Sequence, residues 1–357
     1  MTRKDLPPEI INKIMEGAVI PAIPLALDAD RRFDEKRQKA LVRYYIDAGA
    51  GGIAIAVHTT QFGIRLPEHG LFKPVVSCVG RTIDEFAAIK GKKIVKIGGV
   101  CGRTPQALAE AAFLRENGFH AGLLSMAAFR DDTVEAMIAH AREVAEILPV
   151  FGFYLQPSVG GRILPYGFWR ELVEIDNVIG IKIAPFNRYQ TIDVVRAVCD
   201  AGREEEVVLY TGNDDNIVAD LLTEFRIVSG GREKRVRIRG GLLGQWSVWT
   251  RNAAALHEQI REISHKDLPV PQSLLALGAQ LTEANAVIFD AVNGYSGCIP
   301  GIHEVLRRQG LLAGTWCLNP AETLSAGQSA ELDRIYSSYP HLADDAFVKQ
   351  HLAEWFE

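Results

Sequence analysis

Hydrophobic positions along the chain follow two alternating spacings. Short apolar runs predict strands at Val19–Leu27, Gly52–Val57, Lys93–Cys101, Ala121–Met126, Val150–Leu155, Val178–Ala184, Val207–Thr211 and Gly241–Trp246. Longer stretches between them have apolar residues at helical spacing and predict helices such as Glu35–Ala48, Pro105–Asn117, Thr133–Ile147 and Arg188–Cys199. Eight strands that alternate with helices favour parallel pairing and an α/β fold, a closed (β/α)8 TIM barrel. The alternative is an open doubly wound sheet, but no GxGxxG follows the first strand.

From about Lys266 the pattern becomes purely helical. Helices are predicted at Leu274–Val292, His303–Gln309, Pro320–Ser338 and Ala343–Phe356. We therefore expect a catalytic barrel domain at residues 1–265 and a C-terminal helical extension at residues 266–357. The segment Arg226–Gly240 interrupts the alternation of strands and helices and predicts a basic β-hairpin insertion around Gly230 and Gly231. Such a charged run is usually exposed or a subunit contact, and the alternative is a flap that attracts an acidic substrate or a partner.

Two predicted strands have one bulky face and one face with small residues. Along residues 179–184 the small face carries Gly180, Lys182 and Ala184, and along residues 151–156 it carries Gly152, Tyr154 and Gln156. Side chains alternate between the two faces of a strand. We expect the bulky faces to pack on the outer helices. The small faces should then point into the barrel and leave room around Lys182 and Tyr154.

Composition and charge narrow the class of protein. The 357 residues are 48% hydrophobic and carry a net charge of −5, which gives no general attraction to nucleic acid or to an anionic membrane. The five cysteines form no CxxC pair, which favours a reducing compartment over a disulfide framework or a zinc site. We see neither a signal-peptide pattern nor an apolar segment long enough to span a membrane, so we expect a soluble, cytoplasmic protein.

Chemistry in a barrel belongs at the carboxyl ends of the strands. Lys182 lies near the end of the sixth predicted strand, where desolvation would lower its pKa and free its amine as a nucleophile. Tyr154, near the end of the fifth strand, could relay protons, and Thr59 and Thr60 after the second strand could hold a carboxylate. The alternatives are a salt-bridged lysine, a core tyrosine and an ordinary loop. Lys96 is a rival lysine further from its strand end.

Three motifs together resemble one enzyme family. The stretch NVIGIKIAPFNRYQTIDVV around Lys182 is similar to the lysine motif of the dihydrodipicolinate synthase / N-acetylneuraminate lyase family. PVFGFYLQPSVGG resembles its tyrosine segment, and AVHTTQF its GTTGE carboxylate loop. The motifs occur in family order, and the resemblance runs from about Val19 to the C-terminus, weakest in the hairpin and the last helices.

The resemblance implies an eight-stranded barrel that assembles as a homo-oligomer, a dimer or a tetramer. It implies Lys182 as the residue that forms a Schiff base with a 2-oxo acid, and Tyr154 as the general acid/base. Thr59 and Thr60 would bind the carboxylate. The iminium then serves as an electron sink for aldol cleavage, condensation or dehydration.

Several positions depart from the family pattern. His58, Gln61 and Phe62 replace the glycines and the acid of the GTTGE loop. Phe129 occupies the place of a tyrosine that a neighbouring subunit contributes in the synthase, and Val159 that of a substrate-binding arginine, with Arg162 close by. These changes argue against the lysine-pathway synthase itself.

A further motif, TGNDD, follows the seventh strand. It resembles the segment with which sugar-acid members of the family hold substrate hydroxyls, and it would make Asp214 and Asp215 substrate-binding residues. The alternative is that one of them only caps the next helix. His58 could contribute a second acid/base or bind substrate, although a histidine after a strand is more often structural.

These observations favour a Schiff-base-forming lyase, an aldolase or a dehydratase, that acts on pyruvate or a sugar-derived 2-oxo acid. The alternatives are a barrel that binds a 2-oxo acid without catalysis, and a true synthase with an altered proton relay. A metal-dependent barrel enzyme is disfavoured because the histidines are scattered, with no HxH or HExxH. We expect no cofactor and no metal, a small-molecule partner, and no contact with nucleic acid or membrane.

Overall fold

Eight parallel strands form the centre of the computed structural model, which describes all 357 residues. They are β1 (Val19–Pro21), β2 (Gly52–Ile55), β3 (Val95–Val100), β4 (Ala121–Ser125), β5 (Val150–Leu155), β6 (Val178–Ala184), β7 (Val208–Thr211) and β9 (Arg232–Leu243). Neighbours pair in the order β1-β9-β7-β6-β5-β4-β3-β2. A parallel bridge between Ala22 and Ala54 joins the two ends, so the sheet closes on itself. The predicted (β/α)8 barrel is confirmed.

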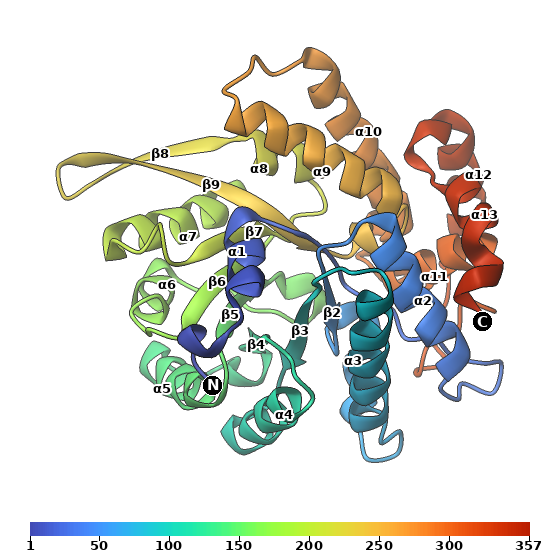
Figure 1. Ribbon diagram of the computed structural model, residues 1–357, viewed down its shortest axis with the longest axis horizontal. Coiled ribbons are helices and arrows are strands. Elements are labelled where there is room, and N and C mark those ends of the chain that lie inside the picture. Colours follow the sequence, from blue (N-terminus) through green and yellow to red (C-terminus); the bar gives the residue numbers. More distant parts are fainter.

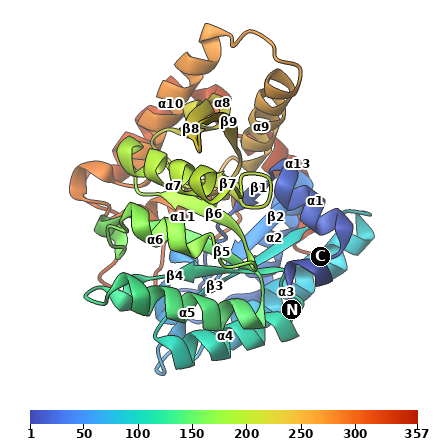
Figure 2. The ribbon, with the colours of Figure 1, turned by 90° about the vertical axis from the view of Figure 1, so that its left-hand side faces the viewer.

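Helices surround this barrel on its outside (Figures 1 and 2). They are α2 (Glu35–Ala48), α3 (Phe72–Ile89), α4 (Thr104–Glu116), α5 (Val134–Ile147), α6 (Tyr166–Leu172), α7 (Arg188–Ala201), α8 (Ile217–Leu222) and α9 (Thr250–His265), whereas α1 (Pro8–Glu16) covers the amino end of the barrel. Local signals set their ends. Helix α7, for example, begins where the Asn187 side chain accepts two backbone N–H groups and ends at Gly202 in the left-handed conformation.

A hairpin extends from the barrel, as the basic insertion predicted. Strand β8 (Glu224–Ser229) pairs antiparallel with the first half of β9, and the turn falls at Gly230 and Gly231, which both have positive φ. Figure 1 shows the hairpin reaching out past α7. It precedes the amino end of the barrel part of β9. This position argues against a flap that attracts the substrate, because active sites of such barrels form at the opposite, carboxyl end of the strands. A role of the hairpin in binding a partner stays a prediction.

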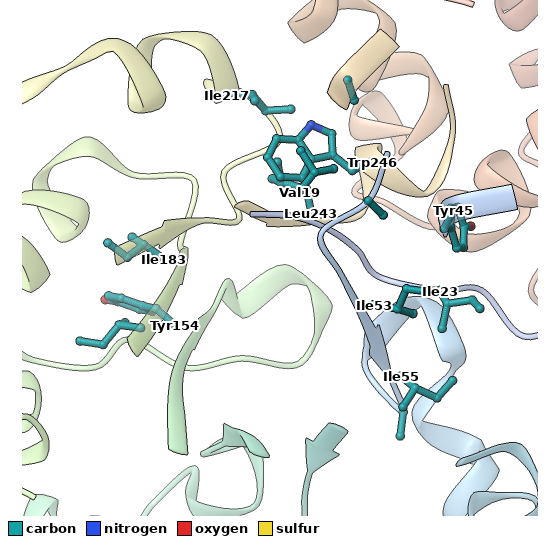
Figure 3. Packing of buried hydrophobic residues seen from close by; sticks show 14 of the residues in the cluster. Val19, Ile23, Tyr45, Ile53, Ile55, Tyr154, Ile183, Ile217, Leu243 and Trp246 are labelled. Carbon is teal, nitrogen blue, oxygen red and sulfur yellow. The ribbon is translucent and has the colours of Figure 1, made fainter. Parts of the chain in front are cut away.

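Two layers of buried side chains hold the barrel together. The inner layer fills the barrel with residues such as Ile97, Leu123, Phe151 and Phe153, and α1 adds Ile10 and Ile14 at the amino end. The outer layer lies between strands and helices, and Figure 3 shows part of it, including Tyr154, Ile183 and Trp246. Because both faces of every barrel strand are buried, the strands consist largely of apolar residues.

The C-terminal segment consists of α10 (Gln272–Ile288), α11 (Cys298–Arg308), α12 (Gln328–Ser338) and α13 (Asp345–Trp355). These helices gather on one side of the barrel, coloured orange to red in Figures 1 and 2. None of the helices in the chain combines the length and the apolar character needed to cross a bilayer. The division into two domains at residue 265 and the oligomeric state stay predictions.

Candidate active site

Lys182 lies inside the barrel and is the centre of the site. Its side chain is 7% exposed, and its Nζ lies 4.5 Å from the centre of the Phe153 ring. The amine forms neither a salt bridge nor a hydrogen bond with another residue, and the charge that acts on its pKa is that of Asp214. The amine faces a cavity of about 60 Å³. Since a water molecule needs roughly 10–15 Å³ of such space, the cavity has room for a few non-hydrogen atoms next to the amine.

The loop after β7 is shaped to leave room for this lysine. A Cβ atom at Gly212 would lie 2.6 Å from Lys182 Cε, so any side chain there would displace the amine. The loop is held by Asp220, whose carboxylate accepts from the Thr211 hydroxyl at 2.7 Å and from Asn213 Nδ2 at 2.9 Å. Asn213 in turn accepts the Phe186 backbone N–H at 3.0 Å, which ties this loop to the end of β6.

Asp214 lines the same cavity and is the anionic counterpart of Lys182. Its carboxylate accepts the Gln245 backbone N–H at 2.9 Å and acts on the amine through its charge, without a salt bridge. Burial lowers the pKa of Lys182 to about 8, and the charge of Asp214 opposes that shift. Burial also raises the pKa of Asp214 to about 7, against the Gln245 N–H and the lysine charge. The two groups therefore titrate as a pair near neutral pH.

Neither aspartate of the TGNDD motif is a helix cap. The N-cap of α8 is Asn216, without a side-chain capping bond, and Asp214 instead binds the loop after β9. Asp215 is exposed, lies near Arg188 at 4.0 Å and does not line the cavity. The structure thus brings Asp214 to the lysine and leaves Asp215 outside, so the placement predicted for Asp215 is wrong.

The turn after β2 contributes His58 and Thr59 to the cavity. Thr59 donates its hydroxyl to the Ala22 carbonyl at 2.6 Å, and Thr60 donates to the Ile23 carbonyl at 2.8 Å. Both hydroxyl hydrogens are therefore used within the protein, and Thr60 does not line the cavity. The direct carboxylate contact predicted for Thr60 is wrong. Burial, helped by the Lys182 charge, lowers the pKa of His58 to about 4, so its imidazole is neutral.

Tyr154 faces away from the cavity, and its predicted inward orientation is wrong. Phe153 pairs with Lys182 in the β5–β6 register and Tyr154 pairs with Ile183, so Phe153 shares the inner face with the lysine. The Tyr154 ring packs on Trp169 of α6 at 5.1 Å, beside Ile183 in Figure 3, and its hydroxyl accepts the Leu164 N–H at 3.3 Å.

The prediction that the small face of β5 points into the barrel is wrong, because the bulky residues of this strand fill the barrel. The small residue Gly152 faces helix α6, where a Cβ would lie 2.8 Å from Leu172 Cδ2. In β6, an extra residue at Ile179 shifts the register with β5. That shift also places Ile179 in the inner layer, against the prediction. The inward placement of Lys182 and Ala184 is confirmed.

Of the other residues that depart from the family pattern, some line the cavity and some lie outside it. Val159, which stands in the place of the family arginine, lines the cavity. Arg162 donates to the backbone carbonyls of Phe129 and Asp132, so it serves the loop after β4 and does not replace that arginine in the cavity. The Phe129 ring packs on His140 at 4.4 Å, outside the cavity. The rival Lys96 is paired with Asp84 at 2.7 Å.

The C-terminal segment supplies part of the cavity wall, which the sequence reasoning missed. The contributing residues are Phe289, Tyr295, Cys298 and Ile302. Tyr295 lies in the loop before α11, and burial raises the pKa of its phenol. The loop has one recognisable signal, the NGYSG turn sequence at residues 293–297, but nothing local connects it to a lysine on β6.

An outer chamber of about 600 Å³ adjoins the inner cavity and shares His58, Val159 and Tyr295 with it. Its lining contains His69, Asn319 and Glu322 but no lysine or arginine. Gln61 also lines it, accepts the Leu318 N–H at 2.7 Å and leaves its buried Nε2 without a partner. Burial raises the pKa of the Glu322 carboxyl. No three His, Cys, Asp or Glu side chains in the chain are grouped so that they could hold a metal ion.

Fold and site together define a class: (β/α)8 barrels with a desolvated, unpaired lysine near the carboxyl end of the sixth barrel strand. The family assignment follows from sequence comparison. The model of the dihydrodipicolinate synthetase family matches residues 15–225, more than half of the chain, and the chain belongs to that family.

Individual relatives are distant. The chloroplastic 4-hydroxy-tetrahydrodipicolinate synthase of Glycine max is 27% identical over 201 residues, which cover 55% of this chain and 54% of that protein. The chain thus spans about half the length of such curated relatives. A prophage protein of the dihydrodipicolinic acid synthase family from E. coli K12, solved with pyruvate, has a TM-score of 0.72 at 17% identity, covering 90% of this chain and 98% of that one. N-acetylneuraminate lyase from Mycoplasma synoviae has a TM-score of 0.66 at 14% identity, covering 92% and 99%.

Proposed function

We propose that this protein is a class I lyase in which Lys182 forms a Schiff base with a 2-oxo acid. The observation that carries the proposal is an amine inside the barrel that has no ion-pair or hydrogen-bond partner and faces a small cavity. A desolvated lysine has a larger neutral fraction at neutral pH than an exposed one, and the neutral amine is the nucleophile. Family membership supports the same chemistry.

The cavity walls support the orientation of a 2-oxo acid. Its carbon at position 2 would lie at Lys182, and its carboxylate would face the turn after β2, where the neutral His58 imidazole has an N–H that can donate. Once the iminium forms, it draws electrons from the adjacent carbon and permits cleavage of a carbon–carbon or carbon–oxygen bond. Asp214, which lines the same cavity, would accept a hydrogen bond from a hydroxyl of the substrate.

The outer chamber supports a substrate with a neutral, hydroxylated far end. A second carboxylate would need a cation to offset its desolvation, and the lining offers none. The Glu322 carboxyl instead suits hydroxyl groups of a substrate as an acceptor. We therefore place a sugar-derived 2-oxo acid ahead of an amino-acid-like partner as the substrate class.

Borohydride trapping tests the Schiff base directly. Wild-type protein incubated with pyruvate and borohydride should acquire one reduced adduct, which peptide mass spectrometry should locate on Lys182. The Lys182→Met variant should acquire none, and Lys96 should stay unmodified because Asp84 keeps it in an ion pair. Absence of an adduct from pyruvate and from a panel of other 2-oxo acids would remove the proposed function.

The trapping rate should depend on pH through the Lys182–Asp214 pair. Since burial lowers the pKa of Lys182 to about 8, the rate should rise with pH and level off above that value. The Asp214 carboxylate favours the ammonium form, so Asp214→Asn should lower the lysine pKa and move the rise to lower pH. Asparagine keeps an oxygen for the Gln245 N–H. Initial trapping rates between about pH 6 and pH 9 measure the shift, and a shift to higher pH would contradict the coupling.

A further inference from the structure

Five titratable side chains line the inner cavity: His58, Lys182, Asp214, Tyr295 and Cys298. Imine formation needs a group that can both give and accept a proton beside the reacting carbon. Tyr154, which the family pattern assigns to this task, packs in the outer layer against Trp169. The inward residue next to it is Phe153, which has no hydroxyl. The inward-facing position of β5 therefore carries no phenol, whereas the cavity wall contains one, on Tyr295.

We infer that Tyr295, from the loop before α11, is the acid–base residue of the reaction at Lys182. The inference rests on the proposed function. The Lys182 amine and the Tyr295 side chain line the same cavity. The Tyr295 ring packs edge-on against Phe186 at 6.0 Å. Phe186 follows β6, the strand that carries Lys182, so the phenol and the amine belong to adjoining parts of the wall.

The backbone at Tyr295 is held in an unfavourable conformation. Its φ of 70° lies in the left-handed region, which costs a residue other than glycine about 1–3 kcal/mol. The buried Asp290 offsets this cost. Its carbonyl accepts the Tyr295 N–H at 3.0 Å, and its carboxylate accepts the Gly297 N–H at 2.9 Å and Asn293 Nδ2 at 2.7 Å. A loop fixed in this way keeps the phenol in place against the cavity.

The other titratable groups are less suited to the task. Burial keeps His58 neutral and raises the pKa of the Cys298 thiol. The Asp214 carboxylate already accepts the Gln245 N–H and offsets the lysine charge. Tyr295 also lines the outer chamber, so its hydroxyl can exchange protons with solvent after each step.

One phenol is enough for all the proton transfers of iminium formation. The neutral amine of Lys182 attacks carbon 2, forming the carbon–nitrogen bond, and the carbonyl oxygen takes the Tyr295 proton. The phenolate then takes a proton from the new ammonium nitrogen, which gives the carbinolamine. The carbon–oxygen bond breaks as the hydroxyl takes the Tyr295 proton again and leaves as water. Solvent in the outer chamber returns one proton to the phenolate, so amine, ketone and one proton give iminium and water.

Two matched variants test the inference: Tyr295→Phe and Tyr154→Phe, each of which removes one hydroxyl and keeps the ring. With pyruvate as the probe, Tyr295→Phe should slow borohydride-trappable adduct formation on Lys182 by roughly 100-fold or more. The pyruvate concentration that gives half the maximal trapping rate should change less than about threefold, because the phenol stabilises the transition state and not the bound substrate. Tyr154→Phe should trap at close to the wild-type rate. Circular dichroism and thermal unfolding should show both variants folded.

The outcomes separate this inference from the proposed function. A wild-type protein that forms no adduct with any 2-oxo acid removes the proposed function. A wild-type protein that forms the adduct, together with a Tyr295→Phe variant that forms it equally fast, overturns the inference alone. A slow Tyr154→Phe beside a normal Tyr295→Phe would return the role to the strand tyrosine. If Tyr295→Phe proves unstable, Tyr295→His, which restores a proton donor and acceptor, should trap at least about tenfold faster than Tyr295→Ala.

Discussion

Replacing Lys182 with methionine should abolish turnover and at the same time make the protein more stable. Methionine fills nearly the same space but has no amine, so neither a covalent adduct nor an iminium can form. We expect the loss of activity to exceed roughly 1,000-fold, because the covalent step has no substitute in the cavity. Lys96→Met, which removes the paired lysine of β3, should by contrast retain adduct formation on Lys182.

The gain in stability follows from the buried charge. The folded pKa of Lys182 is about 8, below the value of an unfolded lysine, so the unfolded chain binds more protons between these two values. The cost of folding is therefore fully present below about pH 8 and disappears as the pH rises toward the unfolded pKa. Methionine removes this cost, which we estimate at on the order of 1–3 kcal/mol near neutral pH. Urea unfolding at pH 7 measures it, and a variant less stable than wild type would contradict the assignment of a desolvated lysine.

Trp169→Ala should destabilise the protein by about 3–5 kcal/mol, the range for removal of a large buried aromatic side chain. Trp169 is fully buried between strand β5 and helix α6, with the Tyr154 ring at 5.1 Å and the Phe168 ring at 5.0 Å. Alanine would leave a cavity that the short helix α6 cannot close without losing its contacts to the strand. Guanidinium unfolding monitored by circular dichroism gives the change in free energy.

Trp169→Phe is the matched control. The indole N–H is buried without a hydrogen-bond partner, so phenylalanine loses no hydrogen bond and keeps most of the aromatic contacts. We expect a loss of only about 1–2 kcal/mol. Both variants should still form the adduct at temperatures where they are folded, because Trp169 does not line the cavity. A loss of less than 1 kcal/mol for alanine would show that this layer is not tightly packed.

The barrel could be predicted from the sequence because its elements are defined locally. Strands β5 and β6 and helix α2 have the predicted bounds, since each is a clear apolar or amphipathic run between polar or turn residues. The last barrel strand was predicted at Gly241–Trp246 but forms at Arg232–Leu243. Its first half belongs to the charged hairpin, where alternating arginines and lysines hide the continuity with the barrel.

The site was harder to predict for a different reason. Lys182 could be identified, because a charged residue inside an apolar strand is unusual whichever way it faces. The orientation of Tyr154 could not, since both faces of a barrel strand are buried and alternation alone does not distinguish inside from outside. The contribution of Tyr295 depends on how the C-terminal helices pack against the carboxyl end of the barrel, 113 positions further along the chain than Lys182.

The shared wall of the inner cavity has a consequence for how this protein can change. The nucleophile and its neighbours on β2, β6 and β7 belong to the barrel, whereas residues 289–322 contribute much of the boundary toward the outer chamber. Mutational libraries confined to this second stretch, with Tyr295 kept, can vary which molecules are accepted and leave the Lys182 amine unchanged. Randomising residues around Gly212, by contrast, would abolish the reaction with every substrate, because the Lys182 side chain needs the space that the glycine leaves. Apart from Tyr295, most residues that border the outer chamber thus lie in a stretch of the gene separate from Lys182, and that stretch can diverge at a different rate.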